Sequence, residues 1–516
     1  MSRANLAGML DGPARRLADR PAVLAGDEPV RTWAGLAEAV ARRAAGLRDR
    51  HGIAPGDAVA LFAANCPEYL EILFSIWHAG AVAVPMSSRL HAREAAALLA
   101  GSRARVCFCT PELVDDLAAA APGTTTLLVV GAGDDAALLE AAPMDPIPRG
   151  FDDDAWIFFT SGTTGRAKGA RLSHGNLLAM SAAYHGDVAQ VTARDSLLHV
   201  AALSHASGLF ALPFLACGAT QVLPASGHFD PAEFLTLVAA NERSTFFVPP
   251  TGLRRLCEAA EQGPPVADRL GTVLVGAAPV PPADLKAAVA ALGPSLWNGY
   301  GQGETPCTIT ALDREAIGAA VRDRDDAALG TVGVARVGTR VRLVDPEGAP
   351  VTTGEVGEVV VDGPTVMSGY LDMPAETAEA LRGGWLHTGD LGRFDERGRL
   401  TLVDRAKDVV ITGGFNVYPR EVEDVLLADP SVAEAAIVGV PDAEWGERVV
   451  AFVVPAPGSS VDRAALDRRC LDAIARHKRP KEYRVLDALP RNAAGKVLKK
   501  ALRDEATAAP TTEGTR

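Results

Sequence analysis

The sequence lacks the features that mark several classes of protein. No apolar run approaches the roughly 20 residues of a membrane-spanning helix. The first thirty residues mix Arg, Asp and Gly and hold no apolar signal-peptide core. Among the seven cysteines there is no CxxC pair and no Cys/His ligand spacing, so no structural zinc site is predicted. Such scattered thiols favour a reducing compartment, and we expect a cytoplasmic protein without a membrane span.

Positive charge is also scarce. The chain has 51 Lys and Arg against 64 Asp and Glu, which gives a formal net charge of −13. A nucleic-acid-binding protein usually carries a basic stripe or patch, so this balance argues against a nucleic-acid partner. It does not exclude small anionic ligands, because a few Lys and Arg can reverse the field inside a cleft.

What the sequence does contain is an alternation of helical and strand patterns. Residues 33–48 predict an amphipathic helix, with Leu36, Val40, Ala44 and Leu47 on one face. A turn at 55–57 then leads into an apolar strand at 58–62. Similar short strands, separated by Ala-rich helical stretches, are predicted at 81–84, 106–109, 126–130, 156–159, 197–200, 245–248 and 272–275. This order predicts an α/β protein with largely parallel sheets.

The texture changes after about residue 331. Gly-punctuated β segments at 340–344 and 355–361 predict a β-rich subdomain, and a second helix-and-strand unit begins near Arg405. We place a domain boundary at 403–407. The small and polar residues 505–516 predict a frayed tail.

A Gly- and hydroxyl-rich segment follows the strand at 156–159. Its glycines let backbone N–H groups approach an anion, its hydroxyls add donors, and Lys168 adds a point charge, so it favours phosphate over a plain surface turn. It lacks the GxxxxGK[ST] spacing of the common phosphate loop. The candidate phosphate-binding residues are Thr160, Ser161, Gly162, Thr163, Thr164, Gly165 and Lys168.

This segment resembles the signature loop of the adenylate-forming superfamily, which includes acyl-CoA synthetases, peptide-synthetase adenylation domains and firefly-type luciferases. Further matching motifs follow in the same order from residue 156 to about 500. The resemblance implies a large N-terminal α/β domain with a β-barrel-like subdomain, over 1–403, and a small mobile α+β domain, over 404–516, with disorder expected after about residue 503.

The segment 298–305 resembles the adenine and magnesium motif of this superfamily. Tyr300 can stack on a purine, Asn298 can bond its exocyclic amine, and the Glu304 carboxylate can hold Mg²⁺. Where the superfamily usually has Thr before the Glu, this chain has Gly303, which removes one hydroxyl donor. Other residues that the resemblance assigns to ATP or AMP are Gly276, Ala277, Ala278, Gly299, Gly301, Asp390 and Arg405.

Four further roles are implied by the resemblance. Lys407 corresponds to the hinge between the domains, and Gly413, Gly414 and Phe415 to the loop that lines a coenzyme A tunnel. Lys496 corresponds to the lysine that stabilises the reacting centre during adenylation, as a cation on a Gly-containing loop can do. His205 corresponds to a position beside the acyl carboxylate.

Together these matches imply an acyl-CoA synthetase that uses ATP, Mg²⁺ and coenzyme A to activate a small-molecule carboxylic acid, as a monomer or homodimer. Three alternatives stay open. They are an adenylation enzyme that loads a carrier protein, a divergent member that uses AMP activation for another coupling such as nitrite-dependent N–N bond formation, and a nucleotide-binding regulator without turnover. The identity of the acid cannot be read from the sequence.

Overall fold

A computed structural model describes residues 4–160, 167–442, 445–492 and 496–508 of the chain. Contacts divide the chain into two compact units. Unit 1 comprises Met1–Val341, Val360–His387 and Gly398–Leu400, and unit 2 comprises Arg342–Val359, Thr388–Arg397 and Thr401–Arg516.

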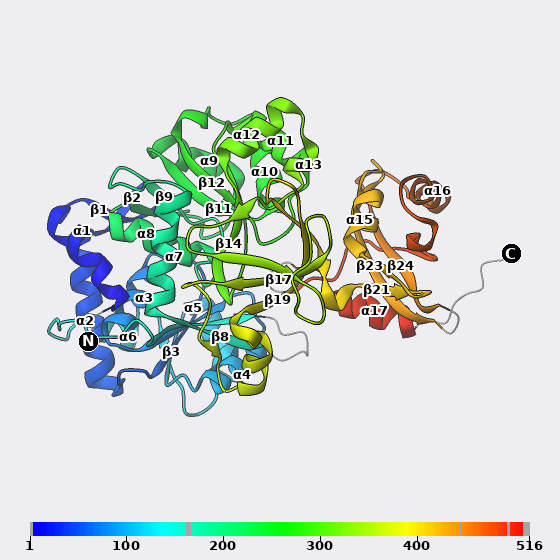
Figure 1. Cartoon of the computed structure of the whole chain (residues 1–516). Coiled ribbons are helices and arrows are strands. Elements are labelled where there is room, and N and C mark those ends of the chain that lie inside the picture. Colours follow the sequence, from blue (N-terminus) through cyan, green and yellow to red (C-terminus); the bar gives the residue numbers. More distant parts are fainter. Residues whose placement is uncertain (1–3, 161–166, 443–444, 493–495, 509–516) are drawn as a thin grey trace. The chain divides into compact units, whose positions relative to one another are not determined.

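A nine-stranded sheet forms one half of unit 1 (Figure 1). Its order is β15-β14-β13-β12-β11-β9-β10-β1-β2, and every pair from β13 to β1 is parallel. Parallel strands bring their carboxyl ends to one edge, where ligands bind in open α/β sheets. The strands are β1 (Pro21–Ala25), β2 (Glu28–Thr32), β9 (Ser196–Leu198), β10 (Thr220–Leu223), β11 (Ser244–Val248), β12 (Leu270–Val275), β13 (Leu296–Gln302), β14 (Thr305–Leu312) and β15 (Val334–Ala335).

A seven-stranded sheet forms the other half, in the order β18-β8-β7-β4-β3-β5-β6. The pairs from β7 to β6 are parallel, and β8 and β18 extend the β7 side as antiparallel strands. Its strands are β3 (Ala58–Ala63), β4 (Val82–Ser87), β5 (Val106–Cys109), β6 (Thr126–Val129), β7 (Asp154–Thr160), β8 (Lys168–Ser173) and β18 (Gly369–Tyr370). The predicted α/β class with largely parallel sheets is confirmed.

Helices α7 (His174–Asp187) and α8 (Ala206–Cys217) pack against each other between the two sheets. Helix α8 contacts β9, β10 and β11, and α7 contacts β7 and β8. Every residue from Ser207 to Leu215 of α8 is buried, as expected for a helix that is apolar on all sides. The outer faces of the sheets are covered by α4 (Ala92–Ser102), α5 (Pro111–Ala118), α9 (Pro231–Ala240), α10 (Pro250–Ala260), α11 (Pro282–Leu292), α12 (Arg314–Asp323) and α13 (Asp326–Leu329).

The N-terminal part of unit 1 contains a buried ionic triad. Arg43 forms ion pairs with Glu71 and, at 2.8 Å from Nε to Oδ1, with Asp135, and all three side chains are at most 1% exposed. Buried charges are tolerated only when they are paired in this way. The three charges come from the helices α2 (Trp33–His51), α3 (Glu68–His78) and α6 (Gly133–Leu138). The same region also holds the 3-10 helix η1 (Leu6–Leu10) and the short helix α1 (Asp11–Arg16).

The β-rich segment predicted after residue 331 is a four-stranded sheet in the order β16-β17-β19-β20. Its residues belong partly to unit 1 and partly to unit 2. The elements of this region are β16 (Arg340–Val344), β17 (Gly357–Asp362), β19 (Leu386–Phe394) and β20 (Leu400–Arg405), with α14 (Pro374–Ala380) and the turn η3 (Arg382–Gly384).

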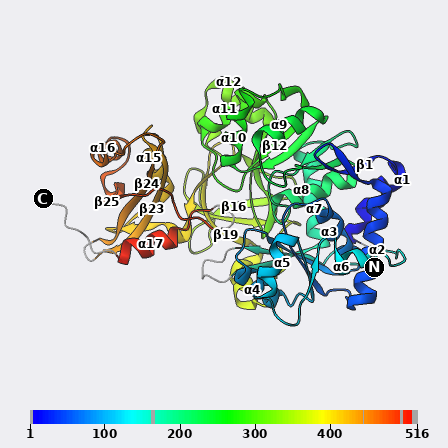
Figure 2. The ribbon, with the colours of Figure 1, turned by 180° about the vertical axis from the view of Figure 1, so that it is seen from behind.

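The C-terminal part of unit 2 is a five-stranded sheet with helices on both faces (Figure 2). Helices α15 and α16 bury Val422, Leu426 and Leu466 on one face, and α17 buries Leu502 and Ala506 on the other. The elements are β21 (Val410–Thr412), β22 (Phe415–Val417), α15 (Pro419–Leu427), β23 (Val432–Asp442), β24 (Gly446–Pro455), α16 (Arg463–Ala473), β25 (Glu482–Val485) and α17 (Lys499–Ala508), with the turns η4 (Ala406–Asp408) and η5 (Arg476–Lys478).

Two sequence-based expectations need correction or completion. The tail predicted to be frayed from about residue 503 or 505 is helical as far as Ala508, because Leu502 and Ala506 lie one turn apart and pack together on the sheet. The rest of the predicted tail, 509–516, lies outside the described residues. Strand β8 also follows the glycine-rich segment before helix α7 begins, and it had no counterpart in the predicted elements. The predicted domain boundary at 403/404 stays a prediction.

Candidate active site

The segment predicted to bind phosphate lies between β7 and β8. Thr160, the last residue of β7, is paired with Lys168, the first residue of β8, in the antiparallel ladder. Because paired residues lie opposite each other, the two side chains are held at the base of the same loop. Ser161, Gly162, Thr163, Thr164 and Gly165 lie outside the described residues.

The predicted metal ligand Glu304 lies next to this loop base. Its side chain is buried, and its Oε1 accepts hydrogen bonds from Thr160 Oγ1 at 3.2 Å and from Tyr370 Oη at 2.9 Å. Lys168 Nζ lies 4.9 Å from the centre of the Tyr370 ring, a cation–π contact. The structure thus brings together Thr160, Lys168 and Glu304, and it adds Tyr370 to them.

The predicted adenine-binding residues come from two neighbouring parallel strands. Gly276 follows β12 directly, and Val275 is paired with Asn298 of β13. A Cβ atom on Gly276 would lie 2.8 Å from the Gly299 carbonyl oxygen, so only glycine permits this close approach of the two backbones. Ala277, with a φ of +67°, turns the chain away from the sheet edge, and both Ala277 and Ala278 are exposed.

Residues 298–302 lie in strand β13. The side chains of Asn298 and Tyr300 are buried, with 4% and 8% exposure, and Gly301 packs against Cys307 of the antiparallel strand β14. The strand ends at Gln302, so Gly303 and Glu304 form the turn into β14. A rigid strand pair therefore positions Glu304.

His205 precedes helix α8 as its N-cap residue. Its Nδ1 lies 2.8 Å from Ser204 Oγ, and its ring makes an edge-to-face contact with Phe158, with ring centres 5.4 Å apart. Phe158 belongs to β7, two residues before Thr160, and was not among the predicted site residues. His205 is therefore packed beside the strand that leads into the phosphate loop.

The two predicted ribose ligands form an ion pair within unit 2. Arg405 Nε lies 2.6 Å from Asp390 Oδ1, and the Asp390 side chain is 10% exposed. Lys407 follows in the turn η4, where burial lowers its pKa. Asp404 accepts the backbone N–H groups of Arg405 and Arg420, and its own burial raises its pKa. Asp404 thus ties the start of the predicted hinge segment to the backbone of both Arg405 and Arg420.

The predicted tunnel loop is a tight turn between β21 and β22. Gly413 and Gly414 both have positive φ, +57° and +80°, a conformation that favours glycine. A Cβ on Gly413 would lie 2.9 Å from the Trp445 ring, whereas a Cβ on Gly414 would meet nothing within 4 Å. Phe415 is 58% exposed and stacks on His477, with ring centres 4.6 Å apart.

Lys496 lies just before the final helix. The backbone N–H of Lys496 donates to Asn492 Oδ1 at 2.9 Å, and its carbonyl accepts the Asn492 N–H at 2.9 Å. Arg491 and Val497 form a β-bridge on either side of these two residues. Lys496 is exposed and belongs to unit 2, and residues 493–495 lie outside the described residues.

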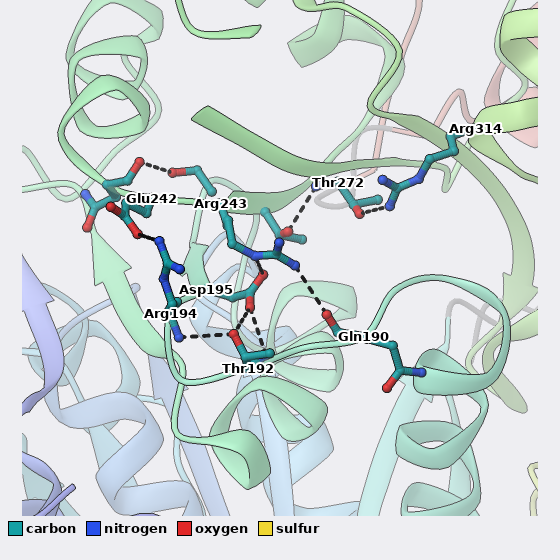
Figure 3. Close-up of polar contacts among 11 residues, drawn as sticks. Gln190, Thr192, Arg194, Asp195, Glu242, Arg243, Thr272 and Arg314 are labelled. Carbon is teal, nitrogen blue, oxygen red and sulfur yellow. Dashed lines mark hydrogen bonds and ion pairs between the residues drawn. The ribbon is translucent and has the colours of Figure 1, made fainter. Parts of the chain in front are cut away.

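A separate polar network lies at the amino ends of the central strands of the nine-stranded sheet, away from the carboxyl ends that carry the motifs (Figure 3). Arg243 Nε donates to Asp195 Oδ1 at 2.8 Å, and Arg314 Nη2 donates to Thr272 Oγ1 at 2.8 Å. These residues line a cavity of about 320 Å³ at the amino ends of β9, β11 and β12. Since Gly276 and Glu304 belong to the carboxyl-end side, this cavity is not the site that the motifs mark.

The described residues offer limited ligands for a metal ion. No group of three or more His, Cys, Asp or Glu side chains that could hold a metal occurs among them. Mg²⁺ is commonly bound by one or two carboxylates together with substrate phosphates, and the Glu304 carboxylate beside the phosphate loop fits that pattern. No helix in the described part of the chain is long and apolar enough to cross a membrane.

Two residues of this site were missed by the sequence analysis. Strand β18 pairs with β8, with Tyr370 opposite Ala170, and this pairing places Tyr370 beside Glu304. Such a long-range contact cannot be predicted from a local sequence pattern. In the sequence, Phe158 is one of several apolar residues of a predicted strand. Its signal is the alternation along β7, which places Phe158 on the same face as Thr160.

The order of these motifs on this fold defines an adenylate-forming enzyme, and comparisons with known proteins agree. The model of the AMP-binding enzyme family matches residues 10–371, and that of the AMP-binding enzyme C-terminal domain matches residues 421–496. The chain belongs to this family and is an AMP-forming acid–CoA ligase of the acyl-CoA synthetase type.

Three relatives illustrate the range of the family. A feruloyl-CoA synthase of Amycolatopsis sp is 40% identical, over 92% of this chain and 93% of the relative. A fatty acid–[acyl-carrier-protein] ligase, ScoC of Streptomyces coeruleorubidus, is 34% identical over 88% and 87%. The crystal structure of ATP-bound MatB from Rhodopseudomonas palustris has a TM-score of 0.89 and 32% identity, covering 98% of this chain and 99% of that one.

Proposed function

We propose that this ligase forms the acyl-adenylate of an aromatic acid at the carboxyl-end edge of unit 1 and passes the acyl group to coenzyme A. The observation that carries the first half is the cluster of Thr160, Lys168 and Glu304 at the base of the glycine-rich loop. A cation, a hydroxyl and a carboxylate gathered there suit a nucleotide triphosphate with its counterion.

In the first half-reaction, a carboxylate oxygen of the acid attacks the α-phosphorus of ATP. A new C–O–P linkage forms, the bond between the α-phosphorus and its bridging oxygen breaks, and pyrophosphate leaves with the electron pair. Such phosphoryl chemistry depends mainly on positioning and charge neutralisation. The segment 160–168 would hold the leaving phosphates, and Asn298, Tyr300 and Gly276 would hold the adenine.

The residues beside the phosphates also suit a divalent cation. Glu304 would hold Mg²⁺ together with phosphate oxygens, and the ion when bound would neutralise charge on the departing pyrophosphate. Thr160 and Tyr370 donate to Glu304 Oε1 and so fix the orientation of its carboxylate.

Unit 2 would supply the ribose ligands Asp390 and Arg405 and the cation Lys496. A lysine at the reacting centre stabilises the charge that develops on the carboxylate and the α-phosphate. In the second half-reaction the chain would turn at Lys407, so that Lys496 leaves and the turn at Gly413, Gly414 and Phe415 takes its place. The thiol then attacks the acyl carbon, and AMP departs with the electron pair of the broken C–O bond.

An aromatic and basic surface on unit 2 supports coenzyme A over a carrier protein as the acceptor. Phe415 stacks on His477, and Lys481 Nζ lies 5.4 Å from the centre of the Trp445 ring, which is 42% exposed. Purines stack on exposed aromatic rings, and Lys and Arg bind phosphates. Coenzyme A carries both groups, whereas the phosphopantetheine arm of a carrier protein has no purine.

The name of the 40% identical relative points to the class of acid. Ferulate is a planar aromatic acid with a propenoate side chain, and the aromatic rings of Phe158 and His205 beside the phosphate loop suit a flat acid. We therefore infer that hydroxycinnamic acids are preferred over saturated fatty acids of similar length.

The test is pyrophosphate release over a panel of hydroxycinnamic, benzoic, dicarboxylic and fatty acids, with and without coenzyme A, and with mass detection of the products. Ferulate-type acids should give the highest kcat/KM, and their CoA thioesters should form without any carrier protein. Preference for another class would overturn the substrate assignment. Thioester formation on an added carrier protein but not on coenzyme A would overturn the acceptor.

A further inference from the structure

Strand β7 presents two different faces, and Phe158 lies on the face that carries the site. Ile157 and Phe159 pack into the apolar core with Phe62 and Val84. Side chains alternate along a strand, so Phe158 points to the other side, together with Trp156 and Thr160. Thr160 on that face bonds Glu304, and Phe158 is only half-buried there.

The space next to the Phe158 ring is available because residue 303 has no side chain. A Cβ atom on Gly303 would lie 2.5 Å from Phe158 Cδ1 and 2.8 Å from Thr160 Cγ2. Real Cβ atoms do not approach other carbons so closely, because the contact is far inside the van der Waals distance. Gly303 has no positive φ, so its glycine is explained by this space and not by backbone conformation.

The Phe158 ring in turn contacts His205. The two rings meet edge to face at an interplanar angle of 84°, with centres 5.4 Å apart. Phe158 also stacks on the buried Trp156, with ring centres 6.4 Å apart. A ring in contact with both Trp156 and His205 cannot rotate away without losing one of these contacts.

We propose that Gly303 and Phe158 act as a matched pair that positions His205 and determines which acids are accepted, an inference that rests on the proposed function. On this proposal, residue 303 is a glycine because an aromatic ring has to fit beside the acid, and the missing hydroxyl is a consequence of that requirement. Phe158 is a positioning and specificity-determining residue, and it narrows the space around the carbon next to the carboxylate, so planar acids enter more readily than α-branched ones.

The experiment is a double-substitution cycle with Gly303→Ala, Phe158→Ala and the double variant. KM for the acid, KM for ATP and kcat are measured by pyrophosphate release with the acid that wild type prefers. Each single substitution should raise KM for the acid about 3- to 10-fold, the range that one aromatic contact contributes, and in Phe158→Ala KM for ATP should change little. The combined effect in the double variant should be smaller than the product of the two single effects, because removing the ring relieves the closest contact of the added methyl group, that with Phe158 Cδ1 at 2.5 Å.

Two comparisons separate this role from simple structural damage. Phe158→Ala should raise the activity with an α-methyl acid relative to its unbranched counterpart. Phe159→Ala, on the core face of the same strand, should lower the melting temperature without changing that ratio. Effects of the single substitutions that multiply in the double variant would overturn the pairing, and so would a change confined to KM for ATP.

A second measurement does not depend on turnover. The same cycle is run on the free energy of unfolding, where coupling between positions 303 and 158 should again appear. If wild type activates no acid, the proposed function fails while this coupling is still measurable. If wild type is active and the unfolding cycle is additive, the pairing alone fails.

Discussion

The candidate site residues of unit 1 and those of unit 2 are held in different ways. In unit 1 Thr160, Lys168, Asn298 and Tyr300 lie on strands, and Glu304, in the turn between β13 and β14, is buried with two hydrogen-bond donors on one oxygen. In unit 2 Phe415 is 58% exposed beside the turn at 413–414, and Lys496 is exposed just before helix α17. Groups that bind charge without rearranging need rigid support, whereas groups that must arrive and leave in turn are better carried on turns.

The largest expected effect is on the rate of adenylation when the exposed Lys496 is replaced. Lys496→Ala should lower the rate of adenylation about 100- to 1,000-fold, because a preorganised charge at the reacting centre is lost. Thioester formation from supplied acyl-AMP should remain close to wild type. Lys500→Ala, a neighbouring exposed lysine of α17, serves as the matched control. Equal loss of both half-reactions would contradict the proposed division of labour between the turns.

The next largest effect is a loss of folding stability at low pH, caused by buried histidines of unit 1. Burial lowers the pKa values of His199 and His174 in unit 1 to about 4, from an ordinary 6.5. Between these values the unfolded chain binds protons that the folded protein does not, so the free energy of unfolding falls as the pH drops from 6.5 to 4. For His199 the loss should reach at most about 3 kcal/mol.

This loss can be measured by chemical denaturation at several pH values. His199→Gln removes the titrating group but keeps an amide that can bond Ser207 and Gln221, the present partners of the imidazole. The variant should therefore show a shallower dependence on pH. An unchanged slope would mean that His199 is not a source of the acid sensitivity.

A smaller effect tests the turn at 413–414. Gly414→Leu should lower thiol transfer about 10-fold and leave adenylation largely intact, because the new side chain would obstruct the path of the thiol. Gly458→Leu is the control, since Gly458 has a similar φ of +75° and equally open surroundings in another turn of unit 2. If both variants lose thiol transfer equally, backbone strain and not obstruction is the cause.

The smallest effect tests the support of Glu304. Tyr370→Phe should lower adenylation only about 3- to 10-fold, because Thr160 still donates to the carboxylate. The concentration of free Mg²⁺ needed for half-maximal pyrophosphate release should rise. Tyr418→Phe in unit 2 should change neither quantity. An unchanged requirement for Mg²⁺ would separate Tyr370 from the metal site.

Most strands and helices could be predicted from the sequence because their periodicity is local. The helix at 33–48 is part of α2, and the apolar runs at 58–62 and 340–344 correspond to β3 and β16. What could not be predicted depends on pairing between distant segments. The contact of Tyr370 with Glu304 needs β18 to pair with β8, and the reason for Gly303 is a ring 145 positions earlier in the chain.

The roles of the site residues stay predictions for a related reason. A motif gives the residue types and their order, but a role depends on what each group touches when substrates are bound. The sequence placed Asp390 and Arg405 in one function, and the structure adds that they are ion-paired with each other. Gly303 was recognised as a departure from the superfamily, yet only the position of the Phe158 ring gives it a physical reason.

The buried triad of Arg43, Glu71 and Asp135 bears on how this chain can be shortened. The first 150 residues carry none of the recognised motifs, which makes them the obvious part to trim. Each charge of the triad comes from a different helix of that region, so deleting any one helix would break at least one of the two buried ion pairs of Arg43. Breaking a buried pair in this way costs about 3–5 kcal/mol, a large fraction of the stability of a typical domain. The segment without catalytic residues is therefore indispensable to the part that has them.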